Sequence, residues 1–160
     1  MDNNQNNKRG AFERFQKPVS EFTEKVVKIK RVSKKTKGGN QIAFTALVVS
    51  GDKKSRVGVG HGRAKSVADA IQKAIKRAQK SMFTVPIVDG TIGSSLKIKF
   101  KGAIILLRPG KKGSGLIAGG PVRSVVELAG IKDLVSKIIG SRNKSINVWT
   151  TLKALSLLKE

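Results

Sequence analysis

Basic side chains stand in local blocks without acidic neighbours, and such blocks can bind phosphate oxygens. Residues 25–37 include seven lysines and arginines and no aspartate or glutamate. Each Lys or Arg that neutralises a nucleic-acid phosphate releases condensed counterions, so a block of this kind favours a polyanionic partner. The whole chain carries 33 Lys and Arg against 10 Asp and Glu, a formal net charge of +23. We therefore expect a nucleic-acid partner; the alternative is a positive surface that only keeps the protein in solution.

A first glycine-rich segment, residues 58–62, reads G-V-G-H-G. A dinucleotide fingerprint would require glycine at position 63, where the chain has arginine, and this argues against a dinucleotide site. Glycine lets a backbone approach another surface closely, so we expect Gly58, Gly60 and Gly62 to lie against RNA phosphates. The neighbouring side chains predicted to bind the same RNA are Arg56, His61, Arg63 and Lys65.

A second glycine-rich segment covers residues 110–120 and contains Lys111, Lys112 and Ser114. It lacks the residue order of a P-loop. Its backbone N–H groups and two ammonium groups can still bind phosphate oxygens. Gly119 and Gly120 directly precede a predicted helix, and a helix N-terminus attracts anions. The alternative is a mobile loop without a partner.

The composition argues against most enzyme chemistry. There is no cysteine and a single histidine, which excludes a thiolate zinc site, a disulfide framework and a conventional triad. The ten acidic residues are scattered, and Glu127 and Asp133 are interpreted as ordinary helix and turn residues. We therefore expect no catalytic residues, no metal and no cofactor. Without tyrosine and with one tryptophan, the chain lacks paired exposed rings for base stacking, which favours folded or double-stranded RNA.

The N-terminal half must position the basic block of residues 25–37 and the glycine-rich segment of residues 58–62. Hydrophobic alternation predicts strands over residues 26–32, 42–49 and 55–59, joined as an antiparallel meander. A long helix follows, with Ser66 as its cap and Asp69 three residues later. Its apolar stripe comprises Val67, Ala70, Ile71, Ala74, Ile75, Ala78 and Met82. The opposite face carries Lys73, Lys76, Arg77 and Lys80, and spacing alone leaves open whether these side chains are solvated or touch RNA.

The C-terminal half must position the glycine-rich segment of residues 110–120. Strands are predicted over residues 96–100, 103–107 and 131–139, and helices over 121–129 and 146–158. The fold class is α+β with two small domains, each a sheet packed by helices. Residues 23–86 form a three-stranded antiparallel sheet with one long helix, and residues 90–160 form an α+β domain of about three to four strands with two helices. Residues 1–22 are expected to be a disordered Asn-rich tail, in which Phe12, Phe15 and Phe22 could share one face of a short docking helix or be incidental.

A series of segments occurs in one order along the chain and carries a family resemblance. They are R-V-S-K at 31–34, K-G-G at 37–39, F-T-A-L at 44–47, R-V-G at 56–58, A-I-Q-K-A at 70–74, I-A-G-G at 117–120, L-A-G-I at 128–131 and I-N-V at 146–148. Together they resemble the family of protein number five of the bacterial small ribosomal subunit, over roughly residues 23–152.

That resemblance implies a structural constituent of the small ribosomal subunit, with an N-terminal domain similar to double-stranded-RNA-binding modules. It implies binding to small-subunit ribosomal RNA at the junction of head and body, and contacts with ribosomal proteins four and eight. It also implies a place near the path by which messenger RNA enters and a role in translational accuracy. The segment from Gly115 to Arg123 would face protein four. We expect a cytoplasmic protein in the small subunit, with no membrane partner and no homo-oligomer.

The predicted RNA-binding residues fall into three groups. The loop within residues 31–39 supplies Arg31, Lys34, Lys35, Lys37, Gly38 and Gly39. The segment around residues 58–62 supplies Arg56, Gly58, Gly60, His61, Gly62, Arg63 and Lys65. The segment of residues 110–120 supplies Lys111, Lys112 and Ser114. Gly115 and Arg123 are the predicted protein contacts. Two other functions stay open at this point: a free regulator that binds double-stranded RNA, and a small phosphotransfer enzyme suggested by the glycine-rich loops.

Overall fold

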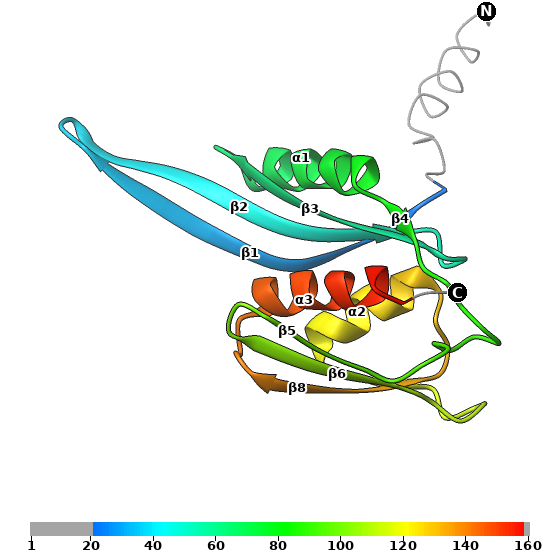
Figure 1. Cartoon of the computed structure of the whole chain (residues 1–160). Helices are drawn as coiled ribbons and strands as arrows, with labels where there is room; N and C mark the ends of the chain where they lie inside the picture. The colour runs from blue at the N-terminus through cyan, green and yellow to red at the C-terminus, as the bar shows by residue number, and fades with distance from the viewer. Residues whose placement is uncertain (1–20, 159–160) are drawn as a thin grey trace, which may run out of the picture.

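The computed structural model describes residues 21–158, which fold into alternating layers of helix and sheet (Figure 1). These layers are helix α1 (Val67–Lys80), a first sheet, the paired helices α2 (Gly120–Ala129) and α3 (Lys144–Ser156), and a second sheet. The predicted α+β class with a sheet in each half is confirmed. The predicted docking helix of the tail, with Phe12 and Phe15, lies outside the described residues.

The first sheet is an antiparallel meander with a long hairpin. Its strands lie in the order β1 (Thr23–Thr36), β2 (Gly39–Gly51), β3 (Arg56–Ala64) and β4 (Phe83–Thr84). β1 and β2 pair from Thr23 opposite Gly51 to Thr36 opposite Gly39, with a bulge between Val26 and Lys28. The predicted three-stranded meander is confirmed, but its strands are longer than predicted and β4 is added at the edge. Past residue 32 the hairpin is polar on both faces, so no hydrophobic alternation marks its length.

Alternate residues of β2 pack against opposite layers of the molecule. Ala46 and Val48 are fully buried and form a cluster with Ala70 and Ala74 of α1. Leu47 and Val49 are buried in the cluster formed by the C-terminal helices. Because successive side chains of a strand point to opposite faces, this sheet is covered on both sides.

Helix α1 begins and packs as its sequence predicts. Ser66 Oγ accepts a hydrogen bond from the backbone N–H of Asp69 at 3.1 Å and donates one to Asp69 Oδ2 at 2.8 Å. This reciprocal pair satisfies a backbone donor that the first turn would otherwise leave free. Ala70, Ala74 and Ala78 are the buried residues of the helix, so its predicted stripe faces the sheet with its smallest members closest.

The second sheet has the strand order β5 (Leu96–Phe100), β6 (Ala103–Pro109), β8 (Leu134–Gly140) and β7 (Leu116–Ile117). The short strand β7 lies parallel to β8, and the other pairs are antiparallel. Gly130 ends α2 in the left-handed conformation, with φ of 92°. β8 therefore begins at Leu134, after the turn that follows this cap, and the predicted start at residue 131 is wrong.

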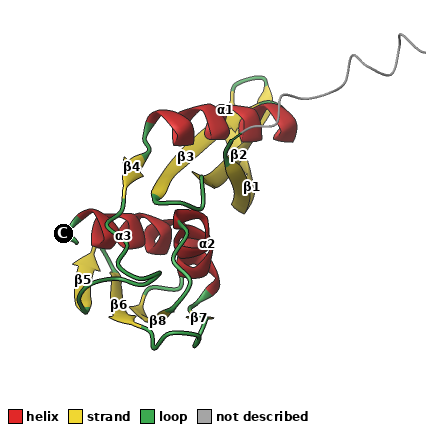
Figure 2. Cartoon of the chain, turned by 90° about the vertical axis from the view of Figure 1, so that its right-hand side faces the viewer, coloured by secondary structure: helices red, strands yellow, loops and turns green. Residues whose placement is uncertain are grey.

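Helices α2 and α3 join the two sheets into one hydrophobic core (Figure 2). A single buried cluster contains Leu47 and Val57 of the first sheet, Leu128 of α2, Leu155 of α3 and Ile105 of the second sheet. The two predicted α+β halves thus share a core, because the helices of the C-terminal half cover a face of the N-terminal sheet. An ion pair of 2.9 Å between Lys25 of β1 and Glu127 of α2 links the same elements at the surface.

Candidate nucleic-acid interface

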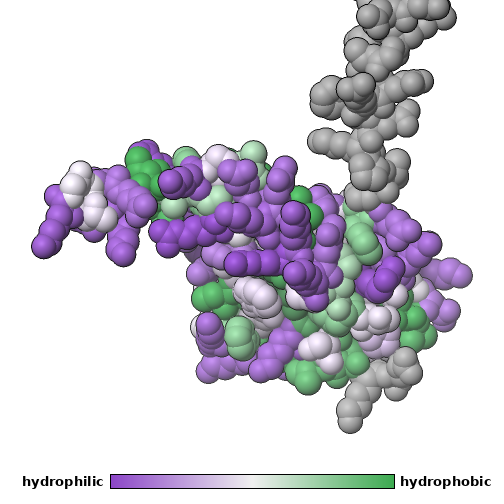
Figure 3. Space-filling model, turned by 90° about the horizontal axis from the view of Figure 1, so that it is seen from above, coloured by the Kyte–Doolittle hydropathy of each residue, from purple (hydrophilic) through white to green (hydrophobic). Residues whose placement is uncertain are grey.

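The distal part of the β1–β2 hairpin projects beyond the rest of the molecule (Figure 1). The last pair between β2 and β3 is Phe44 with Ala64, so the hairpin continues past that point without a third strand. Figure 3 shows hydrophilic side chains along this projection. Exposed residues of the predicted first RNA-binding loop lie here: Arg31, Lys34, Lys35, Lys37, Gly38 and Gly39. A narrow two-stranded arm lined with cations can follow a groove of folded RNA.

The tip of the arm is a tight turn held by its own atoms. Thr36 Oγ1 donates a hydrogen bond to the carbonyl oxygen of Gly39 at 2.8 Å. Gly39 has φ of 125°, a conformation that other residues rarely adopt. Lys34 and Lys35 precede this turn on opposite faces of the ladder, opposite Gln41 and Asn40. The turn therefore presents ammonium groups on both sides of the arm.

The register of the sheet adds a second row of cations where the arm joins the body. Lys30 lies opposite Thr45, and Thr45 lies opposite Arg63, so Lys30 and Arg63 share one face of the sheet. Lys28 and His61 are related in the same way through Leu47. We call this face, with Lys144 at the start of α3, the inner hairpin surface; it consists of Lys28, Lys30, His61, Arg63 and Lys144.

The lysines of this surface lie close enough to affect one another's charge. The pKa of Lys28 is lowered, first by desolvation and then by the neighbouring charges of Lys30 and Lys144. Like charges raise each other's free energy, and a bound phosphate would relieve that repulsion. Arg63 and His61 are among the predicted RNA contacts, whereas Lys28, Lys30 and Lys144 are not. Their proximity follows from strand register and from the packing of α3, which spacing along the chain does not show.

The three glycines of residues 58–62 have a different role from the one predicted. Gly58, Gly60 and Gly62 belong to β3 and are buried under α1. A Cβ atom at these positions would overlap the carbonyl oxygens of Ala78, Ala74 and Ala70, respectively. The prediction that they approach RNA is therefore wrong: they approach the backbone of α1. Arg77 strengthens this packing, since its Nη1 donates a hydrogen bond to the carbonyl oxygen of His61 at 2.6 Å.

Arg56 is engaged within the protein. Its Nε donates to Asp52 Oδ2 at 2.9 Å, and its guanidinium lies 5.5 Å from the centroid of the Phe22 ring. Burial raises the pKa of Asp52, but hydrogen bonds from the backbone N–H groups of Ser55, Lys54 and Arg56 and from the Arg56 side chain lower it well below its usual range. Arg56 thus helps to hold the β2–β3 turn. The other member of this group, Lys65, is exposed between β3 and α1.

The loop after β6 is anchored by a carboxylate that the sequence analysis interpreted as an ordinary turn residue. The two oxygens of buried Asp133 accept hydrogen bonds from Gly113 N at 3.0 Å and Gly115 N at 2.7 Å. These bonds lower the pKa of Asp133, against an opposing effect of burial. Thr91 Oγ1 donates to the carbonyl oxygen of Asp133 at 2.6 Å and accepts from Gly110 N at 3.3 Å.

The hydrogen bonds to Asp133 fix the backbone of the loop after β6, while the side chains of this loop point into solvent. Lys111, Lys112 and Ser114 are exposed on the loop. Gly113 and Gly115 have φ values of 85° and 69°, which the tight turn requires. The loop is therefore held in place and presents two lysines, which argues against the alternative of a mobile loop. Arg123, the other predicted protein contact, is exposed on α2, eight residues from Gly115 in sequence.

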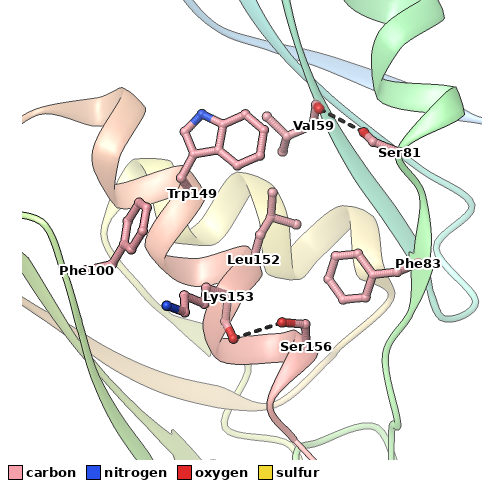
Figure 4. Close-up of a pocket in the computed structure, with 8 residues that line it drawn as sticks. All are labelled: Val59, Ser81, Phe83, Phe100, Trp149, Leu152, Lys153 and Ser156. Atoms are coloured by element: carbon pink, nitrogen blue, oxygen red, sulfur yellow. Dashed lines mark hydrogen bonds between the residues drawn. The ribbon is translucent and has the colours of Figure 1, made fainter.

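A pocket of about 320 Å³ lies between the first sheet and α3 (Figure 4). Phe100 and Trp149 lie on one side of it and Phe83 on the other, with Leu152 of α3 between them. Trp149 is 43% exposed, and Lys153 Nζ lies 5.2 Å from the centroid of the Phe100 ring. The lining is largely apolar. Within residues 21–158, no cluster of three His, Asp or Glu side chains could hold a metal ion.

No helix in the described part of the chain combines the length and apolar character needed to cross a membrane.

Two family models match this chain. Residues 22–86 match ribosomal protein S5, N-terminal domain, and residues 98–160 match ribosomal protein S5, C-terminal domain. A curated relative, small ribosomal subunit protein uS5 of Treponema pallidum, is 51% identical over 128 residues, which cover 80% of this chain and 74% of that protein. The protein of the same name from Campylobacter jejuni is 48% identical over 139 residues, which cover 87% of this chain and 95% of that protein.

Proposed function

The chain belongs to the ribosomal protein S5 family, and from this premise we propose that it is a structural constituent of the small ribosomal subunit that binds ribosomal RNA. The observation that carries the proposal is the projecting hairpin, whose exposed cations continue into the inner hairpin surface. The family is one of structural ribosomal proteins, and we propose no catalytic activity for this chain.

The RNA contacts fall on the elements that present cations. We propose that Arg31, Lys34, Lys35 and Lys37 of the arm bind phosphates, with Gly38 and Gly39 in the turn that follows them. Arg63, His61 and Lys65 would bind beside the body, together with Lys28, Lys30 and Lys144. Lys111, Lys112 and Ser114 would bind RNA from the loop that Asp133 anchors. Recognition of this kind works through phosphates and shape, and it positions the protein more than it reads sequence.

We also propose the finer placement that the family resemblance implies. The protein would bind at the junction of head and body, beside ribosomal proteins four and eight and near the path by which messenger RNA enters. Gly115 and Arg123 would face protein four. Gly115 is held by Asp133, and Arg123 is exposed on α2, so both belong to rigid elements suited to a fixed contact. A contact at this point would support the accuracy of translation.

Sedimentation of ribosomal particles tests this function directly. Tagged chain expressed in bacterial cells should co-sediment with small subunits in stoichiometric amount and stay bound at high salt. A variant with Lys34, Lys35 and Lys37 changed to Gln should release at a lower salt concentration, because each lost phosphate contact reduces affinity. Chain that remains in the free fraction while still binding double-stranded RNA would contradict the proposal and favour a free regulator.

A further inference from the structure

A second pocket, of about 350 Å³, lies where the N-terminal ends of α2 and α3 approach the end of β8. Its size falls in the range of pockets that hold small ligands. Pro121 of α2 and Lys144 of α3 border it, as do Arg142 and Ser141 of the loop before α3. None of these described lining residues is an aspartate or glutamate.

The pocket concentrates positive potential from two sources. The N-terminal end of each helix carries a partial positive charge, and both helices are long enough to develop it. Gly119, the cap residue of α2, provides no side-chain hydrogen bond to the first turn. Arg142 and Lys144 add two full charges, and Lys144 also lies near Lys28. The pocket is therefore continuous with the inner hairpin surface, and a phosphate group suits it.

The same pocket also contains a buried hydrogen-bond acceptor without a partner, Asn147 Oδ1, which requires a donor that a phosphate does not supply. Asn147 lines the pocket and is only 2% exposed. Its Nδ2 donates to the carbonyl oxygen of Ser141 at 3.1 Å, whereas its Oδ1 accepts no hydrogen bond from the described residues. A buried polar atom without a partner is costly, so this acceptor calls for a hydrogen-bond donor from outside the described residues. An RNA phosphodiester carries no proton at neutral pH and cannot donate, whereas the 2′-hydroxyl of ribose can.

We propose that this pocket binds one ribonucleotide of the partner RNA, with its phosphate against Arg142, Lys144 and the two helix ends and its 2′-hydroxyl donating to Asn147 Oδ1. The inference rests on the proposed RNA-binding function and adds a subsite to it. It also gives the chain a means to distinguish RNA from DNA, which phosphate contacts alone do not provide.

The experiment compares binding of a short RNA hairpin with binding of the same hairpin carrying 2′-fluoro sugars. The fluorine keeps the sugar pucker of RNA but cannot donate a hydrogen bond. Asn147→Ala should weaken binding to the RNA by about fivefold, the value of one neutral hydrogen bond. The same variant should bind the 2′-fluoro hairpin as tightly as the unmodified protein does. Equal losses on both hairpins, or no loss on either, would overturn the role of Asn147.

The charged side of the pocket is tested with exposed residues, whose change should leave the fold intact. The double variant Arg142→Gln with Lys144→Gln should flatten the slope of log affinity against log salt by roughly 1.5. It should also reduce the preference for RNA over the 2′-fluoro hairpin. A nucleotide whose phosphate is no longer bound would lose the hydrogen bond from its 2′-hydroxyl to Asn147 Oδ1. The matched control, Lys97→Gln with Lys99→Gln on β5, removes the same charge from exposed positions outside the pocket.

These outcomes separate the pocket from the wider function. If Asn147→Ala fails to fold, as judged by Trp149 fluorescence, the Arg142→Gln and Lys144→Gln double variant still tests the pocket. Its preference for the RNA hairpin over the 2′-fluoro hairpin must be smaller than that of the unmodified protein. Equal salt slopes and unchanged preference in the double variant and its control would overturn the pocket while leaving co-sedimentation with small subunits intact. Failure of the unmodified chain to co-sediment would overturn the proposed function itself.

Discussion

Single acidic residues hold the loops of this strongly basic chain. Asp52 accepts three backbone N–H groups in the β2–β3 turn, and Asp133 accepts two in the loop that presents Lys111 and Lys112. Both carboxylates have lowered pKa values because hydrogen bonds favour their charged forms. These acids, interpreted from the sequence as non-catalytic, therefore fix the shape of segments that we propose to bind RNA.

Changing Asp133→Asn should lower the Tm by several degrees at neutral pH, because an amide cannot accept from Gly113 and Gly115 with two charged oxygens. The folded-state pKa of Asp133 is lowered, so its contribution to stability is present above the unfolded value of about 3.9 and is lost as the pH falls through the lower folded value. The difference in Tm between variant and unmodified protein should therefore shrink in acid.

Thermal unfolding at neutral and strongly acidic pH checks this prediction. Asp89→Asn is the matched control, since Asp89 is exposed and its φ of 49° suits asparagine. A Tm difference for Asp133→Asn that stays the same in acid would mean that the charge of Asp133 has no part in holding the loop.

At the scale of elements, the row of Gly58, Gly60 and Gly62 determines how closely α1 lies on β3. Changing Gly60→Ala should destabilise the protein by about 3 kcal/mol or more, because the new Cβ overlaps the backbone of Ala74 and Ala78. Gly38→Ala is the control: no atom lies within 4 Å of a Cβ there, and the change should cost less than about 0.5 kcal/mol. Urea unfolding measures both, and a Gly60→Ala protein as stable as the unmodified one would mean that α1 does not pack on this row.

Local features of these elements can be predicted from the sequence, whereas their tertiary neighbours cannot. The cap of α1 at Ser66 and its alanine stripe are local patterns, and both are confirmed. The same reasoning placed Gly58, Gly60 and Gly62 against RNA phosphates, because the sequence does not show that helix α1, far from them in local pattern, is the surface they approach. The two-residue strand β7 is too short to show periodicity. Among the cations, the prediction that Arg63 binds RNA rests on its local block, whereas its grouping with Lys30 and Lys144 depends on strand register and helix packing.

The whole molecule unfolds as one unit if its halves share a core, as the cluster joining Leu47, Leu128 and Ile105 indicates. Leu128→Ala should cost about 2–5 kcal/mol and destabilise both sheets together. Circular dichroism reports all elements, whereas fluorescence of Trp149, the single tryptophan, reports the junction of α3 with the first sheet. The two transitions should coincide in the variant and in the unmodified protein. Two separate transitions would contradict a shared core.

The central claim is that the projecting hairpin binds RNA phosphates beyond the general attraction of a chain with a net charge of +23. A salt titration of binding to small-subunit ribosomal RNA tests it with two triple variants. Lys34, Lys35 and Lys37→Gln should flatten the slope of log affinity against log salt by roughly 2, because each phosphate contact contributes about 0.7–0.9. Lys73, Lys76 and Lys80→Gln removes the same charge from the exposed face of α1 and should flatten the slope less. Equal effects of the two triples would contradict the account, since binding would then follow total charge and not the hairpin.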